Sequence, residues 1–259
     1  MTRPTGDPPP AGMPAGGHFT VVAMPAFLAA HTLEQTVRDL PASSADHLLL
    51  VDDASDDTTV EVARGLGIDV RVHDRNLGYG ANQKTCYREA LRLGATVIVL
   101  LHPDYQYDPK AVPALVAPIV AGTADFVFGS RFACTGDPRA GGMPGYRYWG
   151  NRAATLLENA LLRTHFTEMH SGMKAYSRRF LESVPFERYS DSFVFDTQIL
   201  VGAVLGGFRI QEVAIPTRYT SESSSVGVRR SLEYVARSVR VCVAARRDMG
   251  SVRQQRRDG

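Results

Sequence analysis

The chain has 259 residues, of which 44% are hydrophobic and 22% are charged, and its formal net charge is +2 at pH 7. These values are ordinary for a globular chain that buries one sizeable core, so one α/β domain with appendages is expected. Because both signs of charge are abundant, the overall balance does not suggest nucleic acid as a partner.

The first half of the chain alternates short apolar runs with stretches of helical spacing. Strands are expected at residues 19–24, 48–51, 69–72, 96–101 and 125–129, and helices at residues 33–40, 56–66, 81–93 and from Pro109 onward. This alternation predicts an α/β fold whose central sheet is mostly parallel and carries helices on both faces. Residues 1–17 are rich in Pro and Gly and lack an apolar signal core, so a disordered leader is expected before a main domain at residues 18–225.

The second half is less regular. Helices are expected at residues 147–162 and 195–205, a strand at 208–216, a polar loop at 221–227 and a last helix at 229–247. The last helix has an apolar stripe beside many arginines, which makes residues 226–259 a basic amphipathic helix and tail. It is either a membrane-surface helix attracted to anionic lipid, or a helix that packs its stripe on the domain and leaves a solvated basic face.

Cysteine usage and hydropathy bear on the cellular compartment. Cys86, Cys134 and Cys242 lie far apart and form no CxxC pair, which argues against a zinc site and against a disulfide framework and fits a reducing cytosol. No apolar stretch approaches the ~20 residues that a membrane-spanning helix needs. We therefore expect a cytoplasmic protein, either free or attached peripherally at the cytoplasmic membrane face.

Acidic residues follow two of the predicted strands. Asp52 and Asp53 come after the second strand, and Asp104 comes just after the run at 96–101. Ligands of parallel α/β sheets sit beyond the carboxyl ends of the strands, where a carboxylate can accept hydrogen bonds from a nucleobase or ribose. An ordinary helix cap is the alternative for a single Asp at such a position.

The segment His102-Pro103-Asp104-Tyr105-Gln106 is the candidate metal site. Asp104 and Gln106 occupy alternate positions, so an extended segment would point both side chains the same way, and His102 shares their parity. A hard cation such as Mg²⁺ prefers oxygen ligands and often needs only one or two carboxylates beside phosphate oxygens. His102 is either a ligand of a borderline metal such as Mn²⁺, or it forms a hydrogen bond with nearby backbone.

Five segments, taken together and in this order, resemble the family-two glycosyltransferases, and most of all their dolichol-phosphate-mannose-synthase-like branch. They are VVAMPAF at residues 21–27, VDDASDDT at 51–58, NLGYG at 76–80, DYQ at 104–106 and GSR at 129–131. The resemblance covers residues 19–220. It implies a GT-A fold and a metal-dependent, inverting hexosyltransferase that uses a GDP- or UDP-linked sugar with Mg²⁺ or Mn²⁺.

The resemblance also implies roles for individual residues. Pro25, Ala26 and Phe27 match the loop that packs on the nucleoside, and Asp53 matches the carboxylate that contacts the base or ribose. Asp104 matches the second acid of the metal motif at the nucleotide, with Gln106 as its accompanying amide. Arg131 falls where the branch has an arginine that handles phosphate, either the donor's or that of a lipid-phosphate acceptor.

Two departures from the family pattern matter. Leu28-Ala29 replaces an Asn-Glu pair that contacts the nucleoside, and His102 replaces the first acid of the metal motif. The second departure leaves three alternatives: a weaker affinity for the metal, a preference for Mn²⁺, or a ligand from elsewhere, for which Glu168 and His170 are candidates. Both lie in the acceptor-side loop that ends at Gly172; a helix-end turn with a backbone-bonded His is the alternative.

Asp196 is the candidate general base, because residues 192–196 resemble the family segment that supplies an acceptor-side carboxylate. An acceptor hydroxyl needs such a base, whereas an acceptor phosphate is already ionised; Asp196 would then orient other residues, or only stabilise the first turn of a helix. Three functions stay open: transfer to a polyprenyl phosphate, glycosylation of a soluble small molecule or polysaccharide precursor, and non-catalytic binding of a nucleotide sugar.

Overall fold

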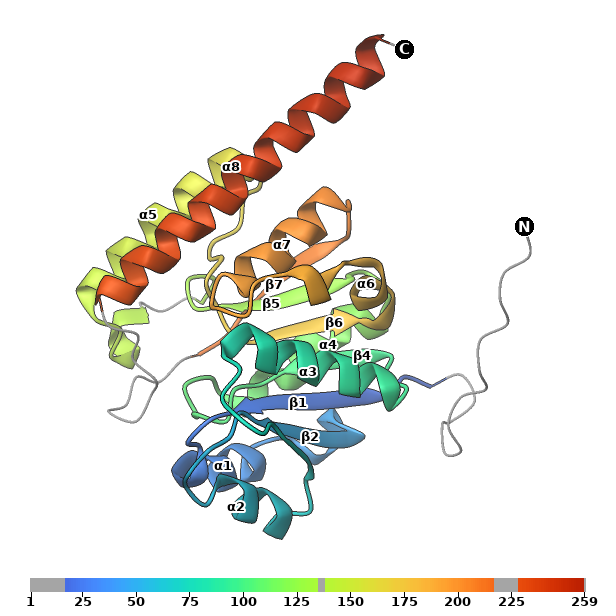
Figure 1. Cartoon of the computed structure of the whole chain (residues 1–259), viewed down its shortest axis with the longest axis vertical. Coiled ribbons are helices and arrows are strands. Elements are labelled where there is room, and N and C mark those ends of the chain that lie inside the picture. The colour runs from blue at the N-terminus through green and yellow to red at the C-terminus, as the bar shows by residue number, and fades with distance from the viewer. Residues whose placement is uncertain (1–16, 135–137, 217–227, 259) are drawn as a thin grey trace.

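The computed structural model describes residues 17–134, 138–216 and 228–258, without the side chains of residues 140–141, 228–232 and 250–258. The described residues contain one seven-stranded sheet in the order β3-β2-β1-β4-β6-β5-β7 (Figure 1). Its strands are β1 (Thr20–Ala26), β2 (His47–Asp52), β3 (Asp69–Val72), β4 (Val97–Leu100), β5 (Phe126–Ser130), β6 (Lys174–Ser177) and β7 (Ile210–Ala214). The predicted α/β class is confirmed.

Most strand pairs in the sheet are parallel, as predicted. Only β6 runs the other way, and it lies antiparallel between β4 and β5. This strand and the helix α6 (Arg178–Ser183) that follows it were not predicted from the sequence. The sequence of β6, Lys-Ala-Tyr-Ser, is short and interrupted by polar residues, so it has no apolar run that would mark a buried strand.

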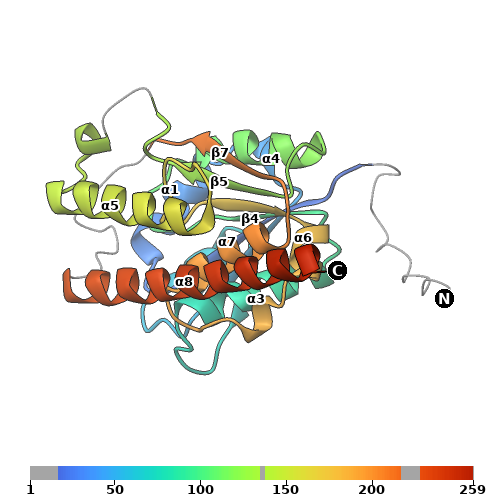
Figure 2. The ribbon, with the colours of Figure 1, turned by 90° about the horizontal axis from the view of Figure 1, so that it is seen from above.

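Helices cover both faces of the sheet, because alternate residues of each strand point to opposite sides. On one face Val21 packs with residues of α3 (Tyr79–Arg92), α6 and α7 (Phe195–Leu205). On the other face Val22 packs with residues of α1 (Ala30–Arg38), α2 (Thr59–Gly65) and α4 (Val112–Val120). Figure 2 shows these layers from above.

Two long helices stand outside these layers and run side by side, α5 (Gly145–Leu162) and α8 (Val228–Asp258) (Figure 1). The Arg246 guanidinium donates to the carbonyls of Ala160 at 3.4 Å and Leu161 at 3.2 Å. α8 continues past the predicted end at residue 247 and extends beyond the rest of the domain. In the described part of the chain, no helix is both long and apolar enough to cross a bilayer.

Three expectations fall on residues whose structure is not described. The leader expected at residues 1–17 is described only at Gly17. The polar loop expected at residues 221–227, and with it the boundary expected between residues 225 and 226, lies within the undescribed segment 217–227.

Candidate functional site

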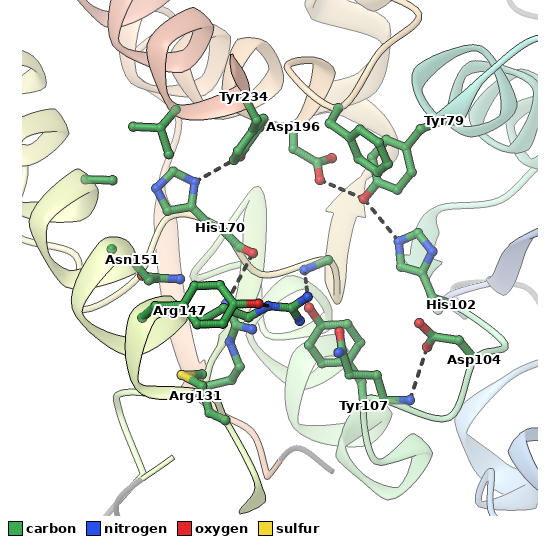
Figure 3. A pocket seen from close by; sticks show the side chains of 18 residues that line it. Tyr79, His102, Asp104, Tyr107, Arg131, Arg147, Asn151, His170, Asp196 and Tyr234 are labelled. Atoms are coloured by element: carbon green, nitrogen blue, oxygen red, sulfur yellow. Dashed lines mark hydrogen bonds between the residues drawn. The ribbon is translucent and has the colours of Figure 1, made fainter. Parts of the chain in front are cut away.

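A cavity of about 330 Å³ lies beyond the carboxyl end of β4, between the sheet and the helices α5 and α8 (Figure 3). Seven of the predicted site residues line it: His102, Asp104, Gln106, Arg131, His170, Gly172 and Asp196. Five others do not: Pro25, Ala26, Phe27, Asp53 and Glu168. The structure thus brings together the residues predicted for the cation and the acceptor, which are separated by up to 94 positions in sequence.

The segment from His102 to Gln106 is a turn, so the prediction of an extended segment is wrong. The Asp104 carboxylate accepts a hydrogen bond from the backbone N–H of Gln106 at 3.1 Å, and Tyr105 between them has a φ of 55°. An Asp that bonds the backbone two residues ahead favours this kind of turn. His102, Asp104 and Gln106 nevertheless reach the same cavity, through the turn and not through strand parity.

His102 is held by an aromatic neighbour. Its ring stacks on Tyr79, with centroids 5.5 Å apart and an angle of 7° between the planes, and its Nε2 lies 3.3 Å from the Tyr79 hydroxyl. Burial lowers the pKa of the His102 imidazole, against the opposing effect of the carboxylates of Asp104 and Asp196. The ring is therefore neutral at pH 7, which is the form that can accept a hydrogen bond or bind a metal.

Gly172 allows the acceptor-side loop to approach this ring. A Cβ at Gly172 would lie 3.0 Å from the Cδ2 of His102, which is tighter than nine in ten real Cβ contacts. The Gly172 N–H donates to the Tyr107 hydroxyl at 2.9 Å, which fixes the loop against the turn after β4. A larger residue at position 172 would displace His102.

The metal-ligand atoms that the cavity offers fit a divalent cation only in part. The Asp104 carboxylate and the Gln106 amide offer oxygen ligands in the cavity, and the neutral His102 ring lies beside them. In the ranges that the structure describes, no three His, Cys, Asp or Glu side chains form a cluster that could hold a metal ion. Such a set suits a cation that takes most of its ligands from a bound diphosphate.

The two residues proposed as additional ligands are engaged elsewhere. His170 places its Nδ1 2.9 Å from the Tyr234 hydroxyl of α8 and its Nε2 3.1 Å from the Glu158 carboxylate of α5. The imidazole thus lies between the two long helices and contacts both. Glu168 is fully buried and binds Arg131.

Arg131 lines the cavity on the side opposite His102 (Figure 3), and its partner Glu168 lies outside the lining. The backbone N–H of Arg131 donates to Glu168 at 2.8 Å and its Nε at 2.7 Å, and Nη2 contacts the same carboxylate. Asn151 of α5 adds a hydrogen bond to Glu168 at 3.0 Å. These bonds fix the guanidinium of Arg131, which lines the cavity together with Arg147. Sequence reasoning missed Arg147, because an exposed helical arginine has the same local pattern.

Asp196 is surrounded by donors. Its carboxylate accepts from the Tyr79 hydroxyl at 2.8 Å and the Gln83 amide at 3.2 Å, and it lies 2.5 Å from the Lys174 ammonium group. Burial raises the pKa of the Tyr79 phenol, and the negative charge of Asp196 raises it further, so the hydroxyl stays protonated and donates. Lys174 was also missed, since nothing in the short run of β6 marks it.

The residues predicted to bind the nucleoside lie at the ends of β1 and β2, outside the cavity. Asp53 is buried, and its carboxylate accepts from His73 at 2.7 Å and from the backbone N–H groups of Leu77 and Gly78 at 2.8 and 2.9 Å. Pro25 and Ala26 are buried within β1, whereas half of the Phe27 side chain is exposed at the end of this strand.

A mixed sheet with an acidic turn after β4 and a cavity beyond it is the architecture of a GT-A glycosyltransferase. The crystal structure of glucosyl-3-phosphoglycerate synthase from Mycobacterium tuberculosis with Mn²⁺, UDP and glucosyl-3-phosphoglycerate has the same fold, with a TM-score of 0.68 and 19% sequence identity. The match covers 89% of this chain and 80% of that one. The expected GT-A fold is confirmed.

The chain belongs to glycosyl transferase family 2, whose family model matches residues 21–184, more than half of its length. Glycosyltransferase AglD of Haloferax volcanii is 31% identical to this chain over the matched region. The match covers 83% of this chain and 35% of AglD. The polyprenol monophosphomannose synthase of Mycolicibacterium smegmatis is 30% identical over 65% of each chain. The predicted family is confirmed.

Proposed function

We propose that this family-two glycosyltransferase is an inverting hexosyltransferase that moves a sugar from a GDP- or UDP-linked donor to a polyprenyl phosphate at the cytoplasmic membrane face. The observation that carries the proposal is the crowding of Asp196, the best candidate for a general base. Its carboxylate is already bound by Tyr79, Gln83 and Lys174. These contacts occupy both carboxylate oxygens of Asp196, so we infer an acceptor that needs no base.

An ionised phosphate is an acceptor of that kind. Arg131 and Arg147 line the cavity, and guanidinium groups match the geometry and charge of phosphate oxygens. The similarity to the polyprenol monophosphomannose synthase of M. smegmatis supports the same class of acceptor.

The donor side of the proposal rests on the turn after β4. Asp104 and Gln106 would bind the divalent cation together with oxygens of the donor's diphosphate, and His102 is the neutral group beside them. When bound, the cation neutralises the charge that develops on the leaving diphosphate. Phe27 offers an exposed aromatic ring for the nucleoside at the end of β1, while Asp53 supports the loop at residues 77–78.

The reaction then requires no proton transfer by the protein. A phosphate oxygen of the acceptor, oriented by Arg131 and Arg147, attacks the anomeric carbon of the sugar. The bond from that carbon to the diphosphate oxygen breaks on the opposite side, and the configuration at the carbon inverts. Asp196 contacts the Tyr79 hydroxyl and the Lys174 ammonium group and positions both beside the cavity.

The test uses a short, water-soluble polyprenyl phosphate and the matching polyprenol, each with GDP- and UDP-hexoses and with Mg²⁺ or Mn²⁺. We expect transfer to the phosphate and none to the alcohol. Equal transfer to the alcohol, or transfer to a soluble sugar or phosphoglycerate in preference to the lipid phosphate, would contradict the proposed acceptor. Binding of the nucleotide sugar without turnover on any acceptor would support the non-catalytic alternative.

A further inference from the structure

The outer face of α5 is apolar, although it faces away from the domain. Four large side chains there are exposed: Tyr146 at 54%, Trp149 at 66%, Leu156 at 73% and Leu157 at 47%. The smaller exposed residues between them, Gly150, Ala153 and Ala160, are also uncharged. A surface helix of a globular protein normally turns its polar residues outward, so an exposed apolar face of this extent points to a contact.

The charges on α5 favour an anionic contact. The charged residues of the helix are Arg147, Arg152 and Glu158. Glu158 is fully buried and is paired with His170 behind the helix. The exposed charge of α5 is therefore positive, and it lies among aromatic rings: the Arg152 guanidinium lies 5.7 Å from the ring centroid of Phe132.

The neighbouring helix α8 has the opposite arrangement. Its residues Ser238, Cys242 and Ala245 are buried, so it uses its less polar side for packing. Its exposed positions carry acids as well as arginines, including Glu233 and Asp248. Of the two long helices, α5 is thus the one whose described surface combines apolar, aromatic and purely basic side chains.

The exposed face adjoins the cavity. Tyr146, Arg147, Gly150 and Asn151 of α5 all line the cavity, while Trp149 and Leu156 lie on the exposed side of the same helix. A lipid whose phosphate lies at Arg147 can therefore have its hydrocarbon chain beside the apolar face of α5.

We propose that the exposed face of α5 docks on an anionic lipid bilayer, with Trp149 and Leu156 at the boundary of headgroups and acyl chains and Arg152 among the headgroups. Aromatic, leucine and arginine side chains in one helix face are the composition of helices that lie in this boundary. The contact places the mouth of the cavity at the bilayer surface. The docking proposal rests on the proposed function only for the identity of the acceptor.

Trp149 is the single tryptophan of the chain, so tryptophan fluorescence, excited selectively over that of tyrosine, reports on α5 alone. We expect the emission to shift to shorter wavelength when the whole protein is mixed with vesicles of phosphatidylcholine and phosphatidylglycerol, and to be quenched by lipids brominated in the acyl chain. Vesicles of phosphatidylcholine alone should give a weaker response, because they offer no charge for Arg152. Binding to vesicles with unchanged, unquenched emission would overturn the assignment to α5, and so would an absence of binding.

A pair of matched substitutions isolates the face. Leu156→Glu should weaken binding to the anionic vesicles by at least about tenfold, because it removes apolar surface that docking would bury and adds a negative charge. Leu66→Glu, at an exposed leucine that follows α2, should leave binding unchanged. Thermal melting confirms that both variants fold. A dimer that Leu156→Glu converts to a monomer, without vesicle binding by either form, would show that a second copy covers this face and would overturn the inference.

The transfer assay separates this inference from the proposed function. Leu156→Glu should reduce transfer to a long-chain polyprenyl phosphate in vesicles and leave transfer to the short, water-soluble acceptor within about twofold of the parent. Equal activity of Leu156→Glu on both acceptors would contradict docking through α5 but would leave the proposed class of acceptor intact. Trp149 quenching by brominated lipid without transfer to either acceptor would keep docking and contradict the proposed function.

Discussion

The ammonium group of Lys174 lies 2.5 Å from the carboxylate of Asp196, and both side chains are buried beside the cavity. Burial lowers the pKa of Lys174, and the charge of Asp196 opposes that shift. Each of the two buried charged groups is thus stabilised by its partner. The pair fixes one edge of the cavity, because Asp196 also binds the Tyr79 hydroxyl that faces His102.

Replacing Lys174 should therefore affect stability and activity together. Lys174→Met leaves the Asp196 carboxylate buried without its cation, and we expect the free energy of unfolding to fall by about 3 kcal/mol. Lys110→Met, at an exposed lysine, should change it by less than about 0.5 kcal/mol. Urea denaturation measures both. Equal, small effects would mean that the pair contributes nothing to the fold.

Replacing Asp104 should abolish the response to the divalent cation. Asp104→Asn removes the negative charge of the turn after β4, and we expect kcat/KM for transfer to fall by about a hundredfold or more. Asp56→Asn, at an exposed position after β2, is the matched control. Calorimetric titration of Mn²⁺ into the protein with GDP or UDP should show weaker binding in the first variant alone. Unchanged transfer in Asp104→Asn would exclude its role in binding the cation.

The contact of His170 with Tyr234 predicts that α8 supports the site. Tyr234→Phe removes the hydroxyl that lies 2.9 Å from Nδ1 of His170, so we expect a loss of about 1 kcal/mol in the free energy of unfolding. Because Tyr234 and His170 both line the cavity, the KM for the acceptor should rise more than the KM for the donor. Tyr189→Phe, outside the cavity, serves as the control. Equal changes in the two KM values would argue that Tyr234 acts on the fold only.

Acid stability should depend on Asp125, far from the cavity. Burial acts to raise the pKa of this carboxyl, but hydrogen bonds from Arg209 and Arg179 prevail and lower it from 3.8 to about 2. Since the folded-state pKa is depressed, its contribution to stability is full above the unfolded pKa and is lost as the pH falls toward 2. The contribution amounts to about 2 kcal/mol. Asp125→Asn should therefore flatten the fall in stability between pH 4 and pH 2, as measured by urea denaturation at each pH; an unchanged slope would contradict this account.

The elements with a clear periodic pattern were predictable from sequence. The predicted strand at residues 69–72 coincides with β3, and the predicted helix at 195–205 coincides with α7. The strand β6 was not predictable, because its place in the sheet is set by pairing with β4 and β5 and not by an apolar run. Likewise, no glycine marks the turn at Tyr105, where a tyrosine adopts the left-handed backbone conformation.

The resemblance predicted part of the lining of the cavity but none of the contacts within it. The resemblance named Arg131, Glu168 and Asp196, yet it gave no sign that Glu168 binds Arg131 or that Lys174 binds Asp196. These partners are 37 and 22 positions apart in sequence, and only the packing of β5, β6 and α7 brings them into contact. Burial of both members of each pair then decides which oxygens remain for a ligand, and a sequence pattern carries no information about burial at that scale.

The arrangement of α8 has a consequence for the order in which the protein is made. Strands β1 to β7 are complete once synthesis has passed residue 214, but Tyr234 and Val235 of α8 still have to arrive before the cavity has its last wall. A nascent chain can thus hold a finished sheet and an unfinished pocket. The cavity is therefore completed only after α8 has been synthesised, and ligand binding is expected to be acquired later than the sheet.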